Sequence, residues 1–350
     1  MRCFHKISMA DWDEIIMQRC IQLAQNGFGT TYPNPMVGCV IVHQGKIIAE
    51  GWHKKAGEPH AEVNAIHQVQ NKEILKEATL YVSLEPCAHH GKTPPCADMI
   101  IHHQIPKVVV GTVDPFAKVN GLGIQKMRNA GIEVKTGVLE KKCRELNKRF
   151  FTFHQEKRPY IILKWAQTAD GFMAAENGEQ KWITNEFSRQ LVHKWRTEEQ
   201  AILVGTMTAE TDNPQLNARL WGGNQPIRLV LDKDLKLNEN LDLFDRSQPT
   251  IVFTQKSKEN LSNLKFIQVE FNENLVEQIL TELYENEIQS VIIEGGKKTL
   301  ETFIQKDLWD EARIFTSEES WKSGISSPDF RGKLIHSKNI SSDRLEIFTR

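Results

Sequence analysis

This chain of 350 residues lacks the features that mark several large classes of protein. No apolar run approaches the roughly 20 residues of a membrane helix, and residues 1–9 contain no apolar core of a signal peptide. Lys and Arg number 44 against 45 Asp and Glu, so the formal net charge is -1. No long-range field therefore draws the chain to nucleic acid or to an acidic membrane, and we expect neither as a partner.

Cysteine is scarce and shows no paired spacing. The six cysteines are Cys3, Cys20, Cys39, Cys87, Cys96 and Cys143. This scatter argues against a disulfide framework and suits a reducing compartment, so we expect a cytoplasmic protein. At roughly 150 residues per domain, the length predicts two domains, each large enough to bury its own core.

The most informative pattern combines His60, Glu62, Cys87 and Cys96. One imidazole and two thiols are a ligand set for a tetrahedral Zn²⁺ ion with its fourth position open. Zinc-dependent nucleobase deaminases combine this set with a glutamate that is not a ligand and that moves protons between the metal-bound water and the leaving amine. A helix that starts at His60 would turn both His60 and Glu62 into one cavity. We therefore predict His60, Cys87 and Cys96 as metal ligands and Glu62 as the catalytic acid and base.

Two structural explanations of the same residues stay open. The set could be two buried cysteines and a surface histidine with no common role. A purely structural zinc would need a fourth protein ligand, which His89 or His90 could supply, but Glu62 would then have no role.

The two cysteines lie further apart than in the Pro-Cys-x-x-Cys pattern of the wider deaminase class. That longer spacing belongs to a set of segments, which read NPMVG at 34–38, GWH at 51–53, AGEPHAEV at 56–63 and EPCAHHGKTPPC at 85–96. Together they closely resemble the bifunctional pyrimidine deaminase–reductases of riboflavin biosynthesis, and the resemblance covers nearly the whole chain. It implies hydrolytic deamination of a diaminopyrimidinone ribosyl 5′-phosphate, with Asn34, His53 and Lys92 holding the nucleotide, and then reduction of the ribosyl group to ribityl.

Apolar periodicity divides the first half of the chain into alternating helices and strands. The predicted elements are helices over 11–25, 60–70, 97–102, 123–130 and 140–151, and strands over 36–43, 47–50, 79–84, 107–112 and 132–136. They predict a three-layer α/β domain, over residues 1–153, with a largely parallel second half and a disordered extension over 1–10. The resemblance implies that this domain is cytidine-deaminase-like.

A charged stretch over residues 154–159 ends in proline and predicts the domain boundary. The second domain, over 159–350, also has an α/β pattern. Its predicted helices cover 185–196, 275–284 and 299–305, and its predicted strands cover 160–164, 201–204, 227–231, 250–253, 265–269, 291–293, 312–315 and 345–348. Thr184 or Asn185 would cap the first of these helices.

A strand, two glycines and a helix follow one another at Gly295 and Gly296, which is a candidate phosphate cradle. The chain has no Gly-x-Gly-x-x-Gly fingerprint, so the sequence does not support a standard Rossmann site. The family that the chain resembles has a dihydrofolate-reductase-like domain, which binds NADPH without that fingerprint. The resemblance, rather than the glycines, therefore implies NADPH as the cofactor.

The same resemblance implies further residues of the reductase. Lys164 would face the ribose carbons as a catalytic residue, and Lys233 would meet the adenosine 2′-phosphate, which favours NADPH over NADH. The expected cofactor contacts are Ala166, Trp182, Thr208, Asp212, Lys233, Gly295, Gly296, Lys297, Lys298 and Thr299. The expected substrate contacts are Gln180, Arg196, Leu216, Arg219 and Glu294. Both arginines suit a phosphate because their planar forks bind two oxygens at once, and Gln180 stands where the family commonly has serine.

Two other functions would use parts of the same pattern. A deaminase of nucleic acid or free nucleosides, fused to an unrelated domain, disagrees with the longer cysteine spacing and the lack of a basic stripe. A zinc-stabilised module that senses nucleotides would not need Glu62. We therefore expect a small pyrimidine ribosyl phosphate as the substrate and a homo-oligomer, a dimer or a tetramer, as the working form.

Overall fold

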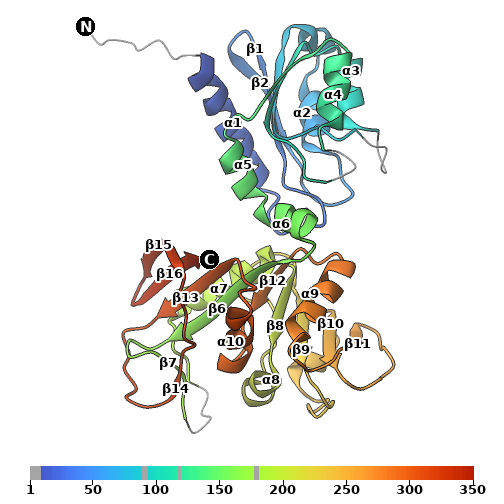
Figure 1. The fold of residues 1–350 in the computed structure, drawn as a ribbon. Helices are drawn as coiled ribbons and strands as arrows, with labels where there is room; N and C mark the ends of the chain where they lie inside the picture. The colour runs from blue at the N-terminus through green and yellow to red at the C-terminus, as the bar shows by residue number, and fades with distance from the viewer. Residues whose placement is uncertain (1–8, 89–93, 117–119, 177–180) are drawn as a thin grey trace, which may run out of the picture. The chain divides into compact units, whose positions relative to one another are not determined.

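Figure 1 shows the computed structural model, which describes residues 9–88, 94–116, 120–176 and 181–350. The chain forms two compact units, Met1–Glu156 and Lys157–Arg350. Each unit contains its own sheet and its own helices, so the predicted α/β class is confirmed. In the described ranges, no helix combines the length and the apolar character that crossing a membrane requires.

The first unit is built on a five-stranded sheet in the order β2-β1-β3-β4-β5. Its strands are β1 (Gly38–His43), β2 (Lys46–Trp52), β3 (Thr79–Leu84), β4 (Lys107–Thr112) and β5 (Glu133–Thr136). Strand β1 is antiparallel to both β2 and β3, whereas β3, β4 and β5 are parallel to one another. The predicted parallel second half is therefore present.

Helices cover both faces of this sheet because successive strand residues point to opposite sides. Cys39 and Ile41 belong to the core on the side of α2 (Ala61–Gln68), α3 (Cys96–His102) and α4 (Leu122–Asn129). Val40 and Val42 belong to the core on the side of α1 (Met9–Gln25) and α5 (Glu140–Leu146). A short 3₁₀ helix, η1 (Lys72–Glu77), precedes β3.

The prediction of one closing helix over 140–151 is wrong. Two helices, α5 and α6 (Lys148–Glu156), meet at Asn147, and α6 extends into the charged stretch over 154–159 that is predicted as the domain boundary. The side chain of Asn147 accepts a hydrogen bond from Met36 N at 2.8 Å and donates one to Met36 O at 2.8 Å. This tertiary contact ends the helix at a position where the apolar pattern alone would let it continue.

The second unit is built on a nine-stranded sheet in the order β11-β10-β9-β8-β12-β6-β13-β16-β15. The strands are β6 (Tyr160–Gln167), β8 (Ala201–Val204), β9 (Ile227–Leu231), β10 (Thr250–Thr254), β11 (Leu264–Gln268), β12 (Ser290–Ile293), β13 (Glu311–Thr316), β15 (Lys333–Ile340) and β16 (Asp343–Thr349). From β11 to β13 all neighbours are parallel, and β16 and β15 continue the sheet antiparallel. A separate ribbon pairs β7 (Phe172–Ala174) with β14 (Ile325–Ser326).

Successive side chains of β6 point to opposite faces of the sheet, and this alternation decides which of them can reach the predicted reductase site. Ile161 and Leu163 share a core with α9 (Leu275–Glu285) and α10 (Lys297–Gln305). Ile162 shares the opposite core with α7 (Glu186–Glu198) and α8 (Thr206–Asp212). Lys164 lies two residues after Ile162, so its side chain is on the same face of the sheet, the face covered by α7.

Several elements of this unit were not predicted, namely α8, β7, β14, β15 and the 3₁₀ helix η2 (Asp242–Phe244). Strand β15 is exposed along seven of its eight residues, so it has no buried face that would produce an alternating pattern. Helix α8 has seven residues, too few for helical periodicity to show.

We expect Asn147→Leu to destabilise the first unit by roughly 2–4 kcal/mol, because it leaves the buried Met36 N–H and C=O without partners. Urea unfolding beside the parent chain measures the loss. Asn129→Leu is the control, since this exposed asparagine ends α4 and should change stability by less than about 0.5 kcal/mol. Equal effects of the two variants would contradict the assigned role of Asn147.

Candidate active sites

The structure brings His60, Cys87 and Cys96 together from three different segments. His60 is the N-cap of α2, Cys87 follows β3, and Cys96 opens α3. Their ligand atoms all lie within 4.8 Å of one another, and among the described residues this is the group that could hold a metal ion. Cys96 N also donates a hydrogen bond to Cys87 Sγ at 3.3 Å, which holds the two thiols in register.

The spacing of these atoms fits zinc. His60 Nδ1 lies 3.7 Å from Cys87 Sγ and 3.3 Å from Cys96 Sγ. Tetrahedral bonds of about 2.3 Å to sulfur and about 2.0 Å to nitrogen would separate such atoms by about 3.5 Å. Hydrogen bonding from Cys96, aided by His60, lowers the pKa of Cys87 to about 4, and the thiolate is the form that binds metal.

Glu62 lies in the first turn of α2, two residues after His60, and its side chain is buried. Burial raises the pKa of Glu62 to about 7, although His60 acts in the opposite direction. A carboxyl group with such a pKa can both accept and release a proton near neutral pH. Bound positive charge beside it would favour the ionised form.

Two predicted substrate contacts of this site form one hydrogen-bonded chain. His53 Nδ1 lies 3.2 Å from Pro59 O, and His53 Nε2 lies 3.1 Å from Asn34 Nδ2. A carbonyl only accepts, so Nδ1 carries the proton and Nε2 accepts from the Asn34 amide. Burial lowers the pKa of His53, which agrees with this neutral form, and its ring packs edge-on against His60 at 5.3 Å.

Two carboxylates beside this site were not predicted. Glu85, two residues before Cys87, is buried and accepts hydrogen bonds from the backbone N–H groups of Asp114, Gly121, Gly123 and Ile124. It therefore anchors the segment that follows β4. Burial raises the pKa of Asp114 in that segment to about 7, with Glu85 and Cys87 contributing. Sequence signals were available for both residues, since Glu85 opens the motif over 85–96 directly after β3 and Asp114 lies two residues after the end of β4.

In the second unit, Glu294 joins two predicted residues. Arg196 Nη2 donates to Glu294 Oε2 at 2.9 Å, and Lys164 Nζ lies 3.8 Å from the same oxygen. Lys164 comes from β6, Arg196 from α7, and Glu294 directly follows β12. Their side chains keep only 10–16% of their surface exposed, so this is a nearly buried cluster of one anion and two cations.

Burial and charge oppose each other in this cluster. Burial alone would raise the pKa of Glu294, but Arg196 and Lys164 outweigh it, so the pKa is lowered and the carboxylate is ionised. Burial lowers the pKa of Lys164, and Glu294 offsets part of that shift. Glu294 Oε1 and Arg196 Nε are buried without a partner among the described residues, so both remain able to bind polar groups of a ligand.

His193, one turn before Arg196, belongs to the same surroundings and was not predicted. Burial lowers its pKa to about 4, and Arg196 and Arg219 add to the shift, so the imidazole is neutral at pH 7. Its Nδ1 is also buried without a partner in the described chain. His193 could have been predicted from the sequence, because it lies three residues before Arg196 in a predicted helix and such positions share one face.

At the predicted phosphate cradle two glycine-containing loops meet, one at Gly205 before α8 and one at Gly295 and Gly296 before α10. Gly296 N donates to Thr208 Oγ1 at 2.8 Å, which ties the start of α10 to α8. A Cβ on Gly295 would lie 2.5 Å from Thr299 Cβ, and one on Gly205 would lie 2.5 Å from Thr299 Oγ1. Glycine is therefore required by close packing at both loops. Lys297 bonds Ser326 Oγ at 2.7 Å, and Lys298 is exposed.

The remaining predicted residues lie in varied surroundings. Ala166 is half-buried on β6, and Asp212 ends α8 at an exposed position. Trp182 is 64% exposed and stacks under the Arg189 guanidinium at 5.1 Å. Lys233 is exposed in the turn after β9, where its carbonyl accepts from Thr254 and Gln255. Lys92, Gln180, His89 and His90 lie outside the described residues.

Two family models match separate parts of the chain. Residues 10–112 match the cytidine and deoxycytidylate deaminase zinc-binding region. Residues 159–317 match the RibD C-terminal domain. The two matches fall on the zinc-type centre and on the Glu294 cluster, respectively.

Similar proteins extend over nearly the whole chain. The riboflavin biosynthesis protein RibD of Aquifex aeolicus is 44% identical over 325 residues, which cover 91% of this chain and 90% of that protein. The RibD protein of Escherichia coli K12 is 35% identical and covers 87% of each chain. A crystal structure of a diaminohydroxyphosphoribosylaminopyrimidine deaminase/5-amino-6-(5-phosphoribosylamino)uracil reductase from Thermotoga maritima superimposes with a TM-score of 0.90 at 38% identity, covering 98% of this chain and 99% of that one.

We expect Cys87→Ser to lose most of its zinc, because a hydroxyl is a much poorer zinc ligand than a thiolate. Metal analysis of the purified protein measures the loss. Cys143→Ser is the control, since this buried thiol lies outside the ligand group and should leave the zinc content unchanged. Full zinc retention in Cys87→Ser would contradict the ligand assignment and point to His89 or His90.

Proposed function

Because the chain belongs to the RibD family of riboflavin biosynthesis, we propose that its first unit deaminates a diaminopyrimidinone ribosyl 5′-phosphate at the His60 centre and that its second unit reduces the ribosyl group at the Glu294 cluster. Family membership, read first from the cysteine spacing and its neighbouring motifs, is confirmed, and with it a bifunctional enzyme that uses zinc and NADPH. The cytidine-deaminase-like and reductase folds are confirmed as well.

In the deaminase, zinc held by His60, Cys87 and Cys96 would supply a hydroxide at neutral pH. Glu62 would take the proton of the attacking water and pass it to the amine, which leaves as ammonia. Asn34, oriented through His53 and Pro59, would bind the pyrimidine edge. Lys92 keeps its expected role as a further nucleotide contact.

In the reductase, NADPH would supply a hydride to C1 of the ribosyl group. The ring oxygen that leaves C1 must receive a proton, and Lys164 is proposed to provide it, since its lowered pKa eases release. Glu294 would hold Lys164 and Arg196 in place and bind a ribose hydroxyl through its unpartnered oxygen. Arg196 and Arg219 would bind the substrate phosphate, Leu216 and Gln180 would complete the substrate contacts, and the loops at Thr208 and Gly296 would carry the cofactor.

The observation that carries this proposal is that each of the two units contains its own cluster of candidate site residues, one around His60 and one around Glu294. The substrates are small molecules. A homo-oligomer, either a dimer or a tetramer, is proposed as the working form. A cytoplasmic location is also proposed, because the five cysteines in the described ranges form no disulfide.

The direct test supplies the diaminopyrimidinone ribosyl phosphate with and without NADPH. Without NADPH we expect ammonia and the deaminated ribosyl compound. With NADPH we expect the ribityl compound and one NADPH oxidised for each ammonia released. NADPH oxidation without any ammonia release would contradict the order of the two steps.

We expect Glu62→Gln and Lys164→Met to separate the two reactions. Removing a general acid–base group typically costs 10²–10⁴-fold in rate. Glu62→Gln should abolish ammonia release while zinc stays bound and deaminated substrate is still reduced. Lys164→Met should stop NADPH oxidation while ammonia is still released. Each substrate must be supplied separately because the deaminase feeds the reductase, and loss of both reactions in a folded, zinc-loaded Glu62→Gln protein would point to one composite site.

We expect Lys233→Glu to raise KM for NADPH by roughly 10–100-fold, the size of one charge-assisted hydrogen bond, because the carboxylate repels the 2′-phosphate. KM for NADH should change little. Lys236→Glu is the control in the same exposed turn and should leave both constants unchanged. Equal responses of NADPH and NADH to Lys233→Glu would count against this role.

A further inference from the structure

The segment Gln215–Arg219 carries two proposed substrate contacts but belongs to no helix or strand. Leu216 has φ of 48°, a left-handed conformation that a leucine adopts only when its surroundings impose it. Its side chain is buried in the core on the α7 side. Contacts with other segments therefore help to hold this backbone.

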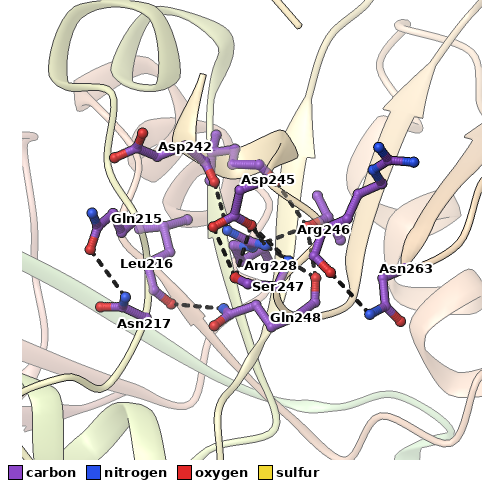
Figure 2. Close-up of polar contacts among 12 residues, drawn as sticks. Gln215, Leu216, Asn217, Arg228, Asp242, Asp245, Arg246, Ser247, Gln248 and Asn263 are labelled. Atoms are coloured by element: carbon purple, nitrogen blue, oxygen red, sulfur yellow. Dashed lines mark hydrogen bonds and ion pairs between the residues drawn. The ribbon is translucent and has the colours of Figure 1, made fainter. Parts of the chain in front are cut away.

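Gln248 supplies the hydrogen bond to Leu216 itself and uses both protons of its side-chain amide. Nε2 donates to Leu216 O at 3.3 Å (Figure 2). It also donates to Pro226 O at 3.1 Å, and Gln248 is buried. These two carbonyls lie near the two ends of the loop that connects α8 to β9. One amide group therefore closes the loop from Leu216 to Pro226.

Arg228 in turn holds Gln248. Its side chain is 1% exposed on β9, and Nη2 donates to Gln248 O at 3.1 Å and to Asp245 Oδ1 at 2.6 Å. Nε donates to Thr250 Oγ1 at 3.0 Å, and Nη1 donates to Asp242 O at 2.8 Å. Figure 2 shows the turn around Asp245 and Ser247 folded over this guanidinium. A continuous hydrogen-bonded path thus runs from the sheet through Gln248 to Leu216.

The far end of this path reaches the candidate active site. Arg196 Nη1 donates to Asn217 O at 3.0 Å while its Nη2 pairs with Glu294. Asn217 Oδ1 accepts from Arg219 Nη1 at 2.9 Å. The residue after Leu216 therefore contacts both arginines that are proposed to bind the substrate phosphate.

We propose that Gln248, held by Arg228, is a positioning residue of the reductase substrate site, which fixes Leu216 and Asn217 so that Arg196 and Arg219 converge on the phosphate. This inference rests on the proposed function of Arg219 and Leu216. Gln248 itself does not touch substrate. It acts through the carbonyl of Leu216, whose left-handed backbone would relax without that hydrogen bond.

The test is Gln248→Met, which removes the amide at similar length and adds no charge. KM for the deaminated ribosyl phosphate should rise about tenfold or more, because small displacements of binding groups are costly. KM for NADPH, ammonia release and kcat should stay close to the parent values. Gln278→Met is the matched control, since the side-chain amide of Gln278 also donates to two backbone carbonyls of the same unit, Glu270 O and Asn274 O, but belongs to α9.

Arg219→Ala and the double variant separate this inference from the proposed function. If Arg219→Ala raises KM for the substrate and Gln248→Met adds little in that background, Gln248 acts through the arginine segment. If Arg219→Ala raises KM and Gln248→Met alone does not, the positioning role is wrong while the proposed function stands. If neither raises KM, both are wrong. A fall in kcat and thermal stability with unchanged KM would show a merely structural residue, and Gln248→Asn replaces the methionine variant if that one does not fold.

Discussion

Both candidate sites depend on parallel pairing between neighbouring strands, because parallel strands end at the same edge of a sheet and bring distant residues together there. In the first unit Leu84 pairs with Thr112, so the segments with Cys87 and Asp114 leave the sheet side by side. In the second unit Leu163 pairs with Ile293, which places Lys164 beside Glu294. Neither cluster would form if these strands slipped in register.

Glu62 and Glu294 are both buried, but their surroundings give the two carboxyl groups different pKa values. For Glu62, burial outweighs the opposing effect of His60 and raises the pKa to about 7, which suits its proposed role as a proton carrier. Glu294 is just as enclosed, but Arg196 and Lys164 lie against it and lower its pKa. It therefore stays charged and orients its neighbours. The difference comes from the cations around each carboxylate rather than from depth of burial.

Most helices and strands could be predicted because the apolar residues of their buried faces recur at a regular spacing in the sequence. The predicted strands over 79–84, 107–112, 201–204 and 227–231 match the structure to the residue. The exceptions share a physical cause. Exposed β15 buries no face, short α8 spans two turns, and α5 ends at Asn147 because of hydrogen bonds to Met36, more than a hundred residues away.

The sequence by itself determined that the first unit belongs to the zinc-dependent deaminases, and it predicted His60, Glu62, Cys87 and Cys96 as the residues of the site. It also determined the family, through motifs that surround those residues. Only the tertiary structure decided how charges and hydrogen bonds are paired: that Glu294 joins Lys164 to Arg196, that His193 stays neutral beside two arginines, and that Gln248 reaches Leu216. Local sequence carries no record of these contacts, because each joins segments that meet only after the sheet has formed.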